Sequence, residues 1–369
     1  MGLPNLTLGI EEEYQIIDPE TRELAPRGET LVAEGQATLQ DQIKPEFMRS
    51  QVEVGTAVCS SIDEARQEVI RLRRRVIELC EKQGLCMVAA STHPFSTWET
   101  QLITAGERYT KLEADLRHVA RRLLIFGMHV HVGIPDPEMR IDVMNQVRYF
   151  LPHLLALSTS SPFWHGRDTG LKSYRSVIFE NMPRSGLPPL FASWSDYQEF
   201  IDTLVETGCI DEPTKIWWDV RPHPKFPTLE VRISDVCTRV DEVICLAALM
   251  QALCAKLIML RQRNQTWRAY RHNLITENKW RAVRYGIDGK LIDFGSRQQV
   301  PLRHLVRELL DFVDDVLDPL GVREAVSHVR TILRDGSSAD RQLARYRDTG
   351  RFEAVVDQLI EETREGVTT

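Results

Sequence analysis

The sequence contains no CxxC pair and no other zinc-ribbon spacing, and its seven cysteines are an odd number scattered along the chain. Several of them, such as Cys245 and Cys254, lie in apolar runs, so we expect small buried side chains in a reducing compartment. No basic-then-apolar signal opens the chain, and no segment is expected to supply the roughly 20 uncharged apolar residues that span a bilayer. These absences predict a cytoplasmic protein.

Excess positive charge is also missing, because 46 Lys and Arg face 53 Asp and Glu and the formal net charge is −7. A net anion is not attracted to nucleic acid or to an anionic membrane, so neither is expected as a partner. The arginine-rich run at 71–75 lies among glutamates on a predicted helix, and we interpret it as a solvated helix face.

Helical and extended patterns alternate irregularly along the chain. Periodicity predicts helices at 61–83, 107–125, 139–157 and 240–263, and almost wholly helical structure from about 301. Alternation, which also pervades the first 60 residues, predicts strands at 8–17, 48–55, 85–90, 126–134, 216–221 and 228–233. Because the order lacks regular βα units, we expect an α+β fold with an antiparallel or mixed sheet.

The division of the chain follows from the same patterns. We expect a single domain over residues 1–369, with a sheet-centred core at 1–295 and a helical C-terminal extension at 296–369. The helix at 240–263 is apolar nearly all round, so it is expected either to be buried or to form a subunit interface. The second reading makes a homodimer a candidate assembly.

Four predicted strands carry similar polar side chains on a single face, because residues i and i+2 of a strand point the same way. The pairs are Glu11 with Glu13, Gln51 with Glu53, His129 with His131, and Glu230 with Arg232. Two glutamates about 6.6 Å apart on one strand repel each other by roughly 2.5 kcal/mol at an effective dielectric constant of about 20. A cation is therefore expected between such groups.

The combined donor set is rich in carboxylates, which suits Mg²⁺ or Mn²⁺ better than Zn²⁺. Arg232 adds a planar donor fork that suits phosphate or carboxylate. Any one pair also fits an exposed strand face or a cross-strand ion pair, and a zinc hydrolase using His129 and His131 is a further alternative. Four such strands in one chain favour a shared metal-binding face.

Several ordered segments resemble the type-2 glutamate–cysteine ligase family, whose members are described as carboxylate–amine ligases. They are GIEEEYQIID, SQVEVGTAVC, AASTHPF, GMHVHVGIPD, SSPFWHGRDTGLKSYR, KIWWDVRPHP and TLEVRISD. The resemblance covers residues 8 to about 240 and continues more weakly through ENKWRAVRYGIDG and GSSADRQLARY. GMHVHV and LEVR also resemble strands of glutamine synthetase, the wider superfamily. GRDTGLKS has the wrong spacing for a P-loop.

The resemblance implies a curved antiparallel sheet of the glutamine-synthetase catalytic type, with metal ions on its concave face. It also implies an enzyme that uses ATP and Mg²⁺ or Mn²⁺ to join amino-acid substrates through an acyl phosphate. The product would be a γ-glutamyl-type amide of glutamate with cysteine or another amine. A guanidino-kinase-like phosphotransferase and a non-catalytic homologue that binds nucleotide or amino acid are the alternatives.

Residue roles carry over by motif position. Metal ligands would be Glu11, Glu13, Glu53, His129 and Glu230, with Glu46 as a further candidate that equally fits a surface glutamate. Arg232, with Glu230 and His131, would act at the transferring phosphate. Contacts to substrate or phosphate are expected from His131, Arg221, Ser173 and Arg175, and a contact to the nucleotide from Lys215.

Two further expectations concern behaviour. The segment 160–192 is rich in aromatics, so it is expected to be ordered and to close over the site through Phe163, Trp164 and Tyr174. Glu53→Gln and Glu230→Gln are expected to abolish activity while leaving the melting temperature unchanged or higher, because each relieves a like-charge repulsion.

Overall fold

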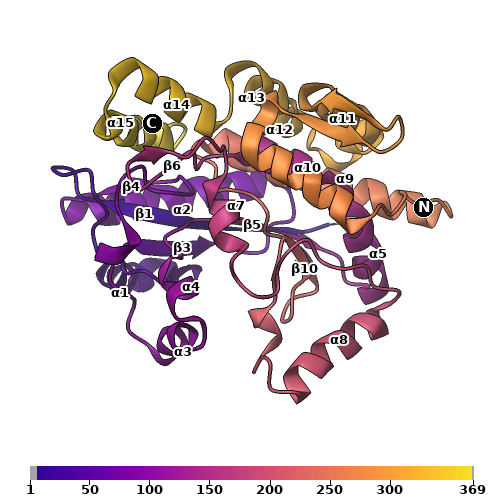
Figure 1. Ribbon diagram of the computed structural model, residues 1–369, viewed down its shortest axis with the longest axis horizontal. Coiled ribbons are helices and arrows are strands. Elements are labelled where there is room, and N and C mark those ends of the chain that lie inside the picture. Colours follow the sequence, from indigo (N-terminus) through magenta and orange to yellow (C-terminus); the bar gives the residue numbers. More distant parts are fainter. Residues whose placement is uncertain (1–5, 368–369) are drawn as a thin grey trace.

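The centre of the computed structural model is a seven-stranded sheet in which every pairing is antiparallel (Figure 1). The strand order is β10-β11-β5-β1-β3-β2, and β4 pairs with the end of β1. The strands are β1 (Leu8–Ile17), β2 (Ile43–Pro45), β3 (Gln51–Gly55), β4 (Cys86–Val88), β5 (Met128–Gly133), β10 (Val220–Pro222) and β11 (Thr228–Val231). The structure describes residues 6–367. Residues 1–5, which belong to the N-terminal segment where no signal sequence is expected, lie outside the described residues.

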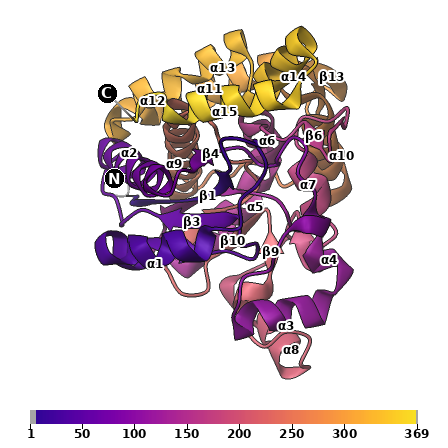
Figure 2. The same cartoon turned by 90° about the vertical axis from the view of Figure 1, so that its left-hand side faces the viewer.

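Helices cover one face of this sheet in two layers. The inner layer contains α2 (Ile62–Lys82), α5 (Pro137–Val147) and α9 (Val240–Gln262). α2 and α9 pack on the central strands β1 and β5, and α5 packs on β10 and β11. The outer layer is formed by the C-terminal helices α11 (Leu302–Leu320), α12 (Arg323–Ser327), α13 (Val329–Asp335), α14 (Ser338–Thr349) and α15 (Phe352–Arg364). α11 and α12 contact α9, and α15 contacts β4, so the outer layer lies above the inner one in both views (Figures 1 and 2).

The remaining helices are α1 (Gly28–Leu39), α3 (Glu107–Leu116), α4 (His118–Arg121), α6 (Leu151–Ser158), α7 (Tyr174–Phe179), α8 (Trp194–Glu206) and α10 (His272–Tyr285). Of these, α6 packs among α9, α10, α11 and α13, and α1 packs against β2 and β3 at one edge of the sheet. The small sheets pair β6 (Phe163–Trp164) with β7 (Arg167–Asp168), β8 (Ser185–Gly186) with β9 (Trp217–Trp218), and β12 (Lys290–Asp293) with β13 (Gln298–Pro301). α3 and α8 lie on the side of the sheet opposite the C-terminal helices (Figure 2). The α+β class with an antiparallel sheet is confirmed.

Several predicted bounds need correction. The segment 107–125 is interrupted at Arg117, which has a φ of 49°, and 139–157 is interrupted by a 3-10 turn at Arg148–Phe150. The extended run 216–221 divides between β9 and β10, which belong to different sheets. The first 60 residues are not all extended, because α1 lies between β1 and β2. These breaks depend on turns that side-chain periodicity does not report.

The arginine run on α2 is not a solvated face throughout. Ser61 caps α2 by accepting the Glu64 amide, and Arg73 is fully buried on the side that faces the sheet. Its guanidinium forms an ion pair with Glu12 of β1 and donates to the Thr238 carbonyl. The apolar layer behind the sheet therefore contains a buried ion pair.

The apolar helix α9 is a core helix. It is long and apolar enough to cross a membrane, contrary to the expectation that no segment would be, and 83% of its most apolar window is buried inside the protein. It lies between the sheet and the C-terminal helices, so it is not available as a subunit interface. The sequence argument for a homodimer from this helix is therefore wrong.

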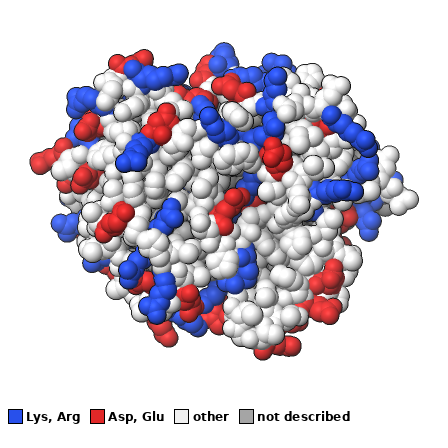
Figure 3. All heavy atoms as spheres, viewed as in Figure 1, with Lys and Arg blue, Asp and Glu red and all other residues white. Residues whose placement is uncertain are grey.

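The surface seen in Figure 3 carries lysine and arginine interspersed with aspartate and glutamate, and no charge of one sign covers this face. Of the seven cysteines, Cys59, Cys80, Cys237, Cys245 and Cys254 are buried free thiols. Cys86 is half-buried, and Cys209 is exposed.

Candidate active site

The polar side chains predicted on four strands lie together on the face of the sheet that the helices leave open. Strand pairing aligns them in rows: Arg221 opposite Glu230, Glu230 opposite His131, Glu11 opposite His129, and Glu13 opposite Glu53. A cavity of about 550 Å³ opens over this face. The prediction that distant segments converge on one wall is confirmed.

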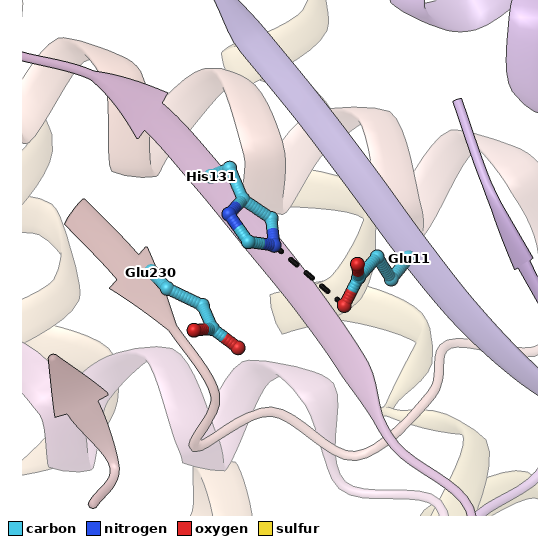
Figure 4. A group of neighbouring side chains, drawn as sticks. All are labelled: Glu11, His131 and Glu230. Atoms are coloured by element: carbon cyan, nitrogen blue, oxygen red, sulfur yellow. Dashed lines mark ion pairs between the residues drawn. The ribbon is translucent and has the colours of Figure 1, made fainter. Parts of the chain in front are cut away.

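The first acidic cluster contains Glu11, His131 and Glu230, whose ligand atoms all lie within 4.8 Å of one another (Figure 4). His131 Nε2 lies 3.6 Å from Glu11 Oε2. His129 lies beside this cluster, with Nδ1 at 3.2 Å from Glu11 Oε2 and 3.9 Å from Glu230 Oε1. Sequence reasoning named His129 as the ligand, and His131 adds a second imidazole whose nitrogen lies within 4.8 Å of both carboxylates.

The second acidic cluster contains Glu13, Glu46 and Glu53, which also bring ligand atoms within 4.8 Å of one another. Glu46 follows β2, which pairs with β3 beside Glu53, so Glu46 belongs to the site and not to the outer surface. Lys44 Nζ lies 3.6 Å from Glu53 Oε1. Sequence reasoning did not name Lys44, although it lies two residues before Glu46 and opposite Glu53.

The carboxyl groups of the second cluster are protonated more readily than usual. Burial and the charge of Glu53 raise the pKa of Glu13 to about 7. Burial and the charges of Glu53 and Glu13 raise the pKa of Glu46 well above its ordinary value, and burial with the Glu11 charge raises the pKa of Glu53. Three like charges in one buried group repel each other, and a bound cation would relieve this repulsion.

In the first acidic cluster the pKa values of the carboxyl groups are lowered instead of raised. Burial alone would raise the pKa of Glu230, but the charges of Arg232 and Arg221 lower it far below its ordinary value. The neighbouring imidazoles of His129 and His131 likewise lower the pKa of Glu11 against the effect of burial. Both carboxylates are therefore ionised in the folded protein.

The imidazoles of His129 and His131 differ in the direction in which their pKa is shifted. Burial and the Arg232 charge lower the pKa of His129 to about 4, so its ring is neutral at pH 7. Burial would also lower the pKa of His131, but the neighbouring carboxylates of Glu11 and Glu230 raise it. His131 Nε2 is buried and has no hydrogen-bond partner among residues 6–367. An unpartnered imidazole nitrogen between two carboxylates fits a divalent cation.

Two arginines bind Glu230. Arg232 Nη1 donates to one carboxylate oxygen, and Arg221 Nε donates to the other at 2.8 Å. Arg221 also donates to the carbonyls of Thr214 and Ile216, so it fixes the 213–216 turn against the sheet. The Nε of Arg232 is buried without a partner in the described chain.

The other predicted contact residues divide between the cavity and the core. Arg175 lines the cavity, and its charge lowers the pKa of Glu13. Lys215 lines the cavity and forms ion pairs with Asp211 at 2.8 Å and Asp115 at 3.5 Å. Ser173 does not line the cavity, because its hydroxyl donates to buried Asp235 at 2.8 Å. Ser173 is thus part of a buried hydrogen-bonded network.

The segment 160–192 contributes less to the cavity than expected. Phe163 is buried against Tyr346 and Phe352 of the C-terminal helices, and Trp164 stacks on His165. Neither lines the cavity, which this segment reaches through Arg175, Phe179 and Met182. Phe163 therefore anchors the segment to the C-terminal helices, and Tyr174, the third aromatic named for closure of the site, packs on Trp164.

The fold is similar to that of two enzymes of known structure. Glutamate–cysteine ligase from Francisella tularensis, in complex with AMP, superposes with a TM-score of 0.73 at 14% identity, over 100% of this chain and 90% of that one. A bifunctional glutathione synthetase from Pasteurella multocida has a TM-score of 0.68 at 13% identity, over 98% of this chain and 52% of that one. Fold, site and sequence relatives together define an ATP-dependent carboxylate–amine ligase.

Sequence comparison gives the family. The sequence model of glutamate–cysteine ligase family 2 (GCS2) matches residues 7–358. Proteins named "Putative glutamate--cysteine ligase 2" from Herpetosiphon aurantiacus and Sorangium cellulosum are each 56% identical, over 98% of this chain and 94% and 97% of theirs. The chain belongs to glutamate–cysteine ligase family 2.

Proposed function

We propose that this ligase forms a γ-glutamyl-type amide, with glutamate as the carboxylate and cysteine or another amino acid as the amine. The observation that carries the proposal is the convergence of two acidic clusters and Arg232 on one wall of one cavity. The names of the family and of its relatives support glutamate and cysteine as substrates. The AMP complex of the Francisella tularensis enzyme supports a nucleotide site.

The first step activates the carboxylate. A carboxylate resists attack by an amine because oxide would have to leave, so a carboxylate oxygen first attacks the γ-phosphorus of ATP. The bond to ADP breaks, and an acyl phosphate forms. Arg232 lies beside Glu230 with a buried, unpartnered Nε, and it supplies a fixed positive charge for the phosphoryl oxygens.

The second step forms the amide. The neutral amine attacks the acyl carbon, the carbon–oxygen bond to phosphate breaks, and the amine nitrogen loses a proton. Water must be kept from the acyl phosphate during this step. The buried floor of the cavity and the aromatic side chains of Phe47, Tyr109, Phe179 and Trp217 around it serve that exclusion.

Mg²⁺ or Mn²⁺ is proposed at both acidic clusters. Glu11, His131 and Glu230 would hold one ion with His129 beside them, and Glu13, Glu46 and Glu53 would hold a second. Bound ions supply charge neutralisation at the phosphate oxygens. Arg175 and Lys215 remain candidates for substrate and nucleotide contacts because both line the cavity. Ser173 is withdrawn from that role.

Three properties of the whole chain belong to the same proposal. We propose one catalytic unit over residues 1–369, because Lys172 and Glu242 of the core form ion pairs with Asp340 and Arg341 of the C-terminal helices. A cytoplasmic location fits the buried free thiols. The homodimer stays a prediction without support from α9, and sedimentation of the purified chain measures it.

The test is an ATP-dependent phosphate-release assay over pairs of carboxylate and amine, with mass spectrometry of the product. We expect phosphate and a γ-glutamyl amide only when glutamate, an amine, ATP and Mg²⁺ are all present. Glu53→Gln is expected to abolish turnover, and Glu34→Gln, an exposed glutamate on α1, is the matched control.

The alternatives give different products. A guanidino-kinase-like enzyme would produce ADP and a phosphorylated nitrogen without releasing phosphate, and a non-catalytic homologue would produce no ADP with any pair. Phosphate release with an acyl donor other than glutamate would retain the ligase and refute the proposed substrate.

A further inference from the structure

A second cavity of about 440 Å³ lies outside the acidic face, between the N-terminal turn of α8 and the loop that joins β10 to β11. The loop, residues 223–227, separates it from the active-site cavity, because His223, Lys225 and Phe226 line both. α5 contributes Arg140 to the second cavity, and α8 contributes Trp194, Tyr197, Gln198, Ile201 and Asp202.

Arg140 is the unusual group in this cavity. Only 7% of its surface is exposed, and among the described residues its side chain forms a single long hydrogen bond, 3.4 Å from Nη2 to the Pro135 carbonyl. Its Nε is buried and has no hydrogen-bond partner within residues 6–367. The Asp136 carboxylate, which caps α5 by accepting the Glu138 amide at 3.0 Å, acts on Arg140 only at longer range, and no carboxylate within residues 6–367 lies within ion-pair distance of the guanidinium. A buried guanidinium without an anion is costly unless a ligand supplies one.

The surroundings of Arg140 are aromatic and apolar. Its guanidinium carbon lies 5.1 Å from the centre of the Trp194 ring, which fixes the group in place. Tyr197 and Ile201 are each only 6% exposed and form part of the wall, together with Pro213, Pro224 and Pro227. Such a wall receives a flat or apolar body and excludes water from its contact with Arg140.

The wall shared with the active site is held by its own hydrogen bonds. His223 Nδ1 accepts the backbone amides of Lys225 at 3.2 Å and Phe226 at 3.0 Å, and the His223 ring stacks on that of Phe226. The His223 ring also makes an edge contact with the His131 ring, with ring centres 5.3 Å apart. The two cavities are therefore separate spaces on either side of one ordered turn.

We propose that the second cavity binds a small carboxylate with an apolar or aromatic body, which is distinct from the substrates of the ligase reaction. The carboxylate pairs with the guanidinium of Arg140, and the body packs on Tyr197 and Ile201. Lys225 adds a second positive charge at the loop, and Asp202 gives the cavity a single carboxylate. The net positive lining selects an anion over a cation.

The probe is phenylacetate, with binding to the full chain measured by isothermal titration calorimetry. We expect saturable one-to-one binding, and no binding of the neutral methyl ester or of phenethylamine, which lack the carboxylate. Arg140→Gln is expected to weaken phenylacetate at least about tenfold, because it removes a charge-assisted hydrogen bond. Arg330→Gln, which replaces an exposed arginine on α13, is the matched control and is expected to bind like the parent chain.

Further measurements distinguish loss of phenylacetate binding from a folding defect, and binding at the second cavity from binding at the active site. Gln198→Trp fills the cavity from an exposed position on α8, and it is expected to block phenylacetate while preserving the melting temperature. Arg232→Gln and saturating ATP with Mg²⁺ are both expected to leave phenylacetate binding intact. Equal affinity in Arg140→Gln, equal affinity of the ester, displacement by ATP with Mg²⁺, or absence of saturable binding would each overturn the proposal.

Discussion

Replacing Glu13 with glutamine is expected to stabilise the metal-free protein at neutral and alkaline pH. Burial and the Glu53 charge raise the pKa of Glu13 from 4.5 to about 7. A carboxyl group with a raised pKa binds more protons in the folded state, so its contribution to stability falls as the pH rises from the unfolded value through the folded value. The window of this loss is therefore about pH 4.5 to 7.

The magnitude follows from the size of the shift. The pKa change at Glu13 corresponds to about 3 kcal/mol of folding free energy once the pH exceeds the folded-state pKa. Glutamine stays neutral and still offers an oxygen to the Gly127 amide, which now donates to Glu13 at 2.7 Å. For a chain of 369 residues, about 3 kcal/mol raises the melting temperature by about 4 °C.

The assay is thermal unfolding in EDTA between pH 5 and pH 8. Glu13→Gln is expected to match the parent chain near pH 5 and to exceed it near pH 8, and Glu34→Gln is expected to follow the parent at every pH. A lower melting temperature for Glu13→Gln at pH 8, or an unchanged pH dependence, would refute the repulsion within the second acidic cluster.

The remaining predictions concern the other charged groups. Glu230→Gln is expected to lower the free energy of unfolding by about 3 kcal/mol, because it leaves two buried arginines without their carboxylate. This differs from the sequence-based expectation of an unchanged or higher melting temperature. Urea unfolding measures the change, and an undiminished free energy of unfolding would contradict the prediction. Mg²⁺ or Mn²⁺ is expected to raise the melting temperature more at pH 8 than at pH 6, since the ligands must lose protons. Glu53→Gln should reduce that rise, and an undiminished rise would place the ions elsewhere. Arg73→Ala is expected to cost about 3–5 kcal/mol in urea unfolding, because Glu12 stays buried without its cationic partner. A cost below about 1 kcal/mol would refute the contribution of this ion pair to stability.

The strands and their polar face were predictable because alternation has a period that the sequence displays directly. The predicted bounds of β1 agree with the structure, and the pairing of Glu11 with His129 places groups from distant segments in one row. The α2 cap at Ser61 was predictable for a similar reason, since it depends only on residues three apart. Local patterns therefore determined which side chains share a face.

The buried ion pair was missed although both of its members break a pattern. Glu12 lies on the apolar side of β1 between Ile10 and Tyr14, and Arg73 lies four residues after Val69 on the apolar stripe of α2. A carboxylate and a guanidinium that both lie at core-facing positions indicate a buried ion pair between them, because burying either charge alone is costly. Reading the arginine run as a block of charge concealed this signal.

Partner choice within the site could not be read from the motifs. Ser173 and Arg175 lie two residues apart in one motif, yet the hydroxyl binds Asp235 in the core and the guanidinium reaches the cavity. The same limit applies to His129 and His131, which share a face: the register places His131 opposite Glu230, yet the His129 ring reaches to 3.9 Å from the Glu230 carboxylate. Directions of this kind depend on tertiary contacts between distant segments.

Three consecutive glutamates at the centre of β1 also determine how that strand aligns during folding. The outer two face the cavity, and the middle one enters the apolar layer to meet Arg73. A shift of the β1 register by one residue would turn Glu11 and Glu13 into the apolar layer, where Arg73 could pair with only one of them. The same shift would turn Glu12 toward the cavity, away from Arg73. The Glu12–Arg73 ion pair thus favours the native register of β1. A one-residue insertion or deletion within β1 is therefore expected to prevent correct folding of the sheet, and not only to reduce activity.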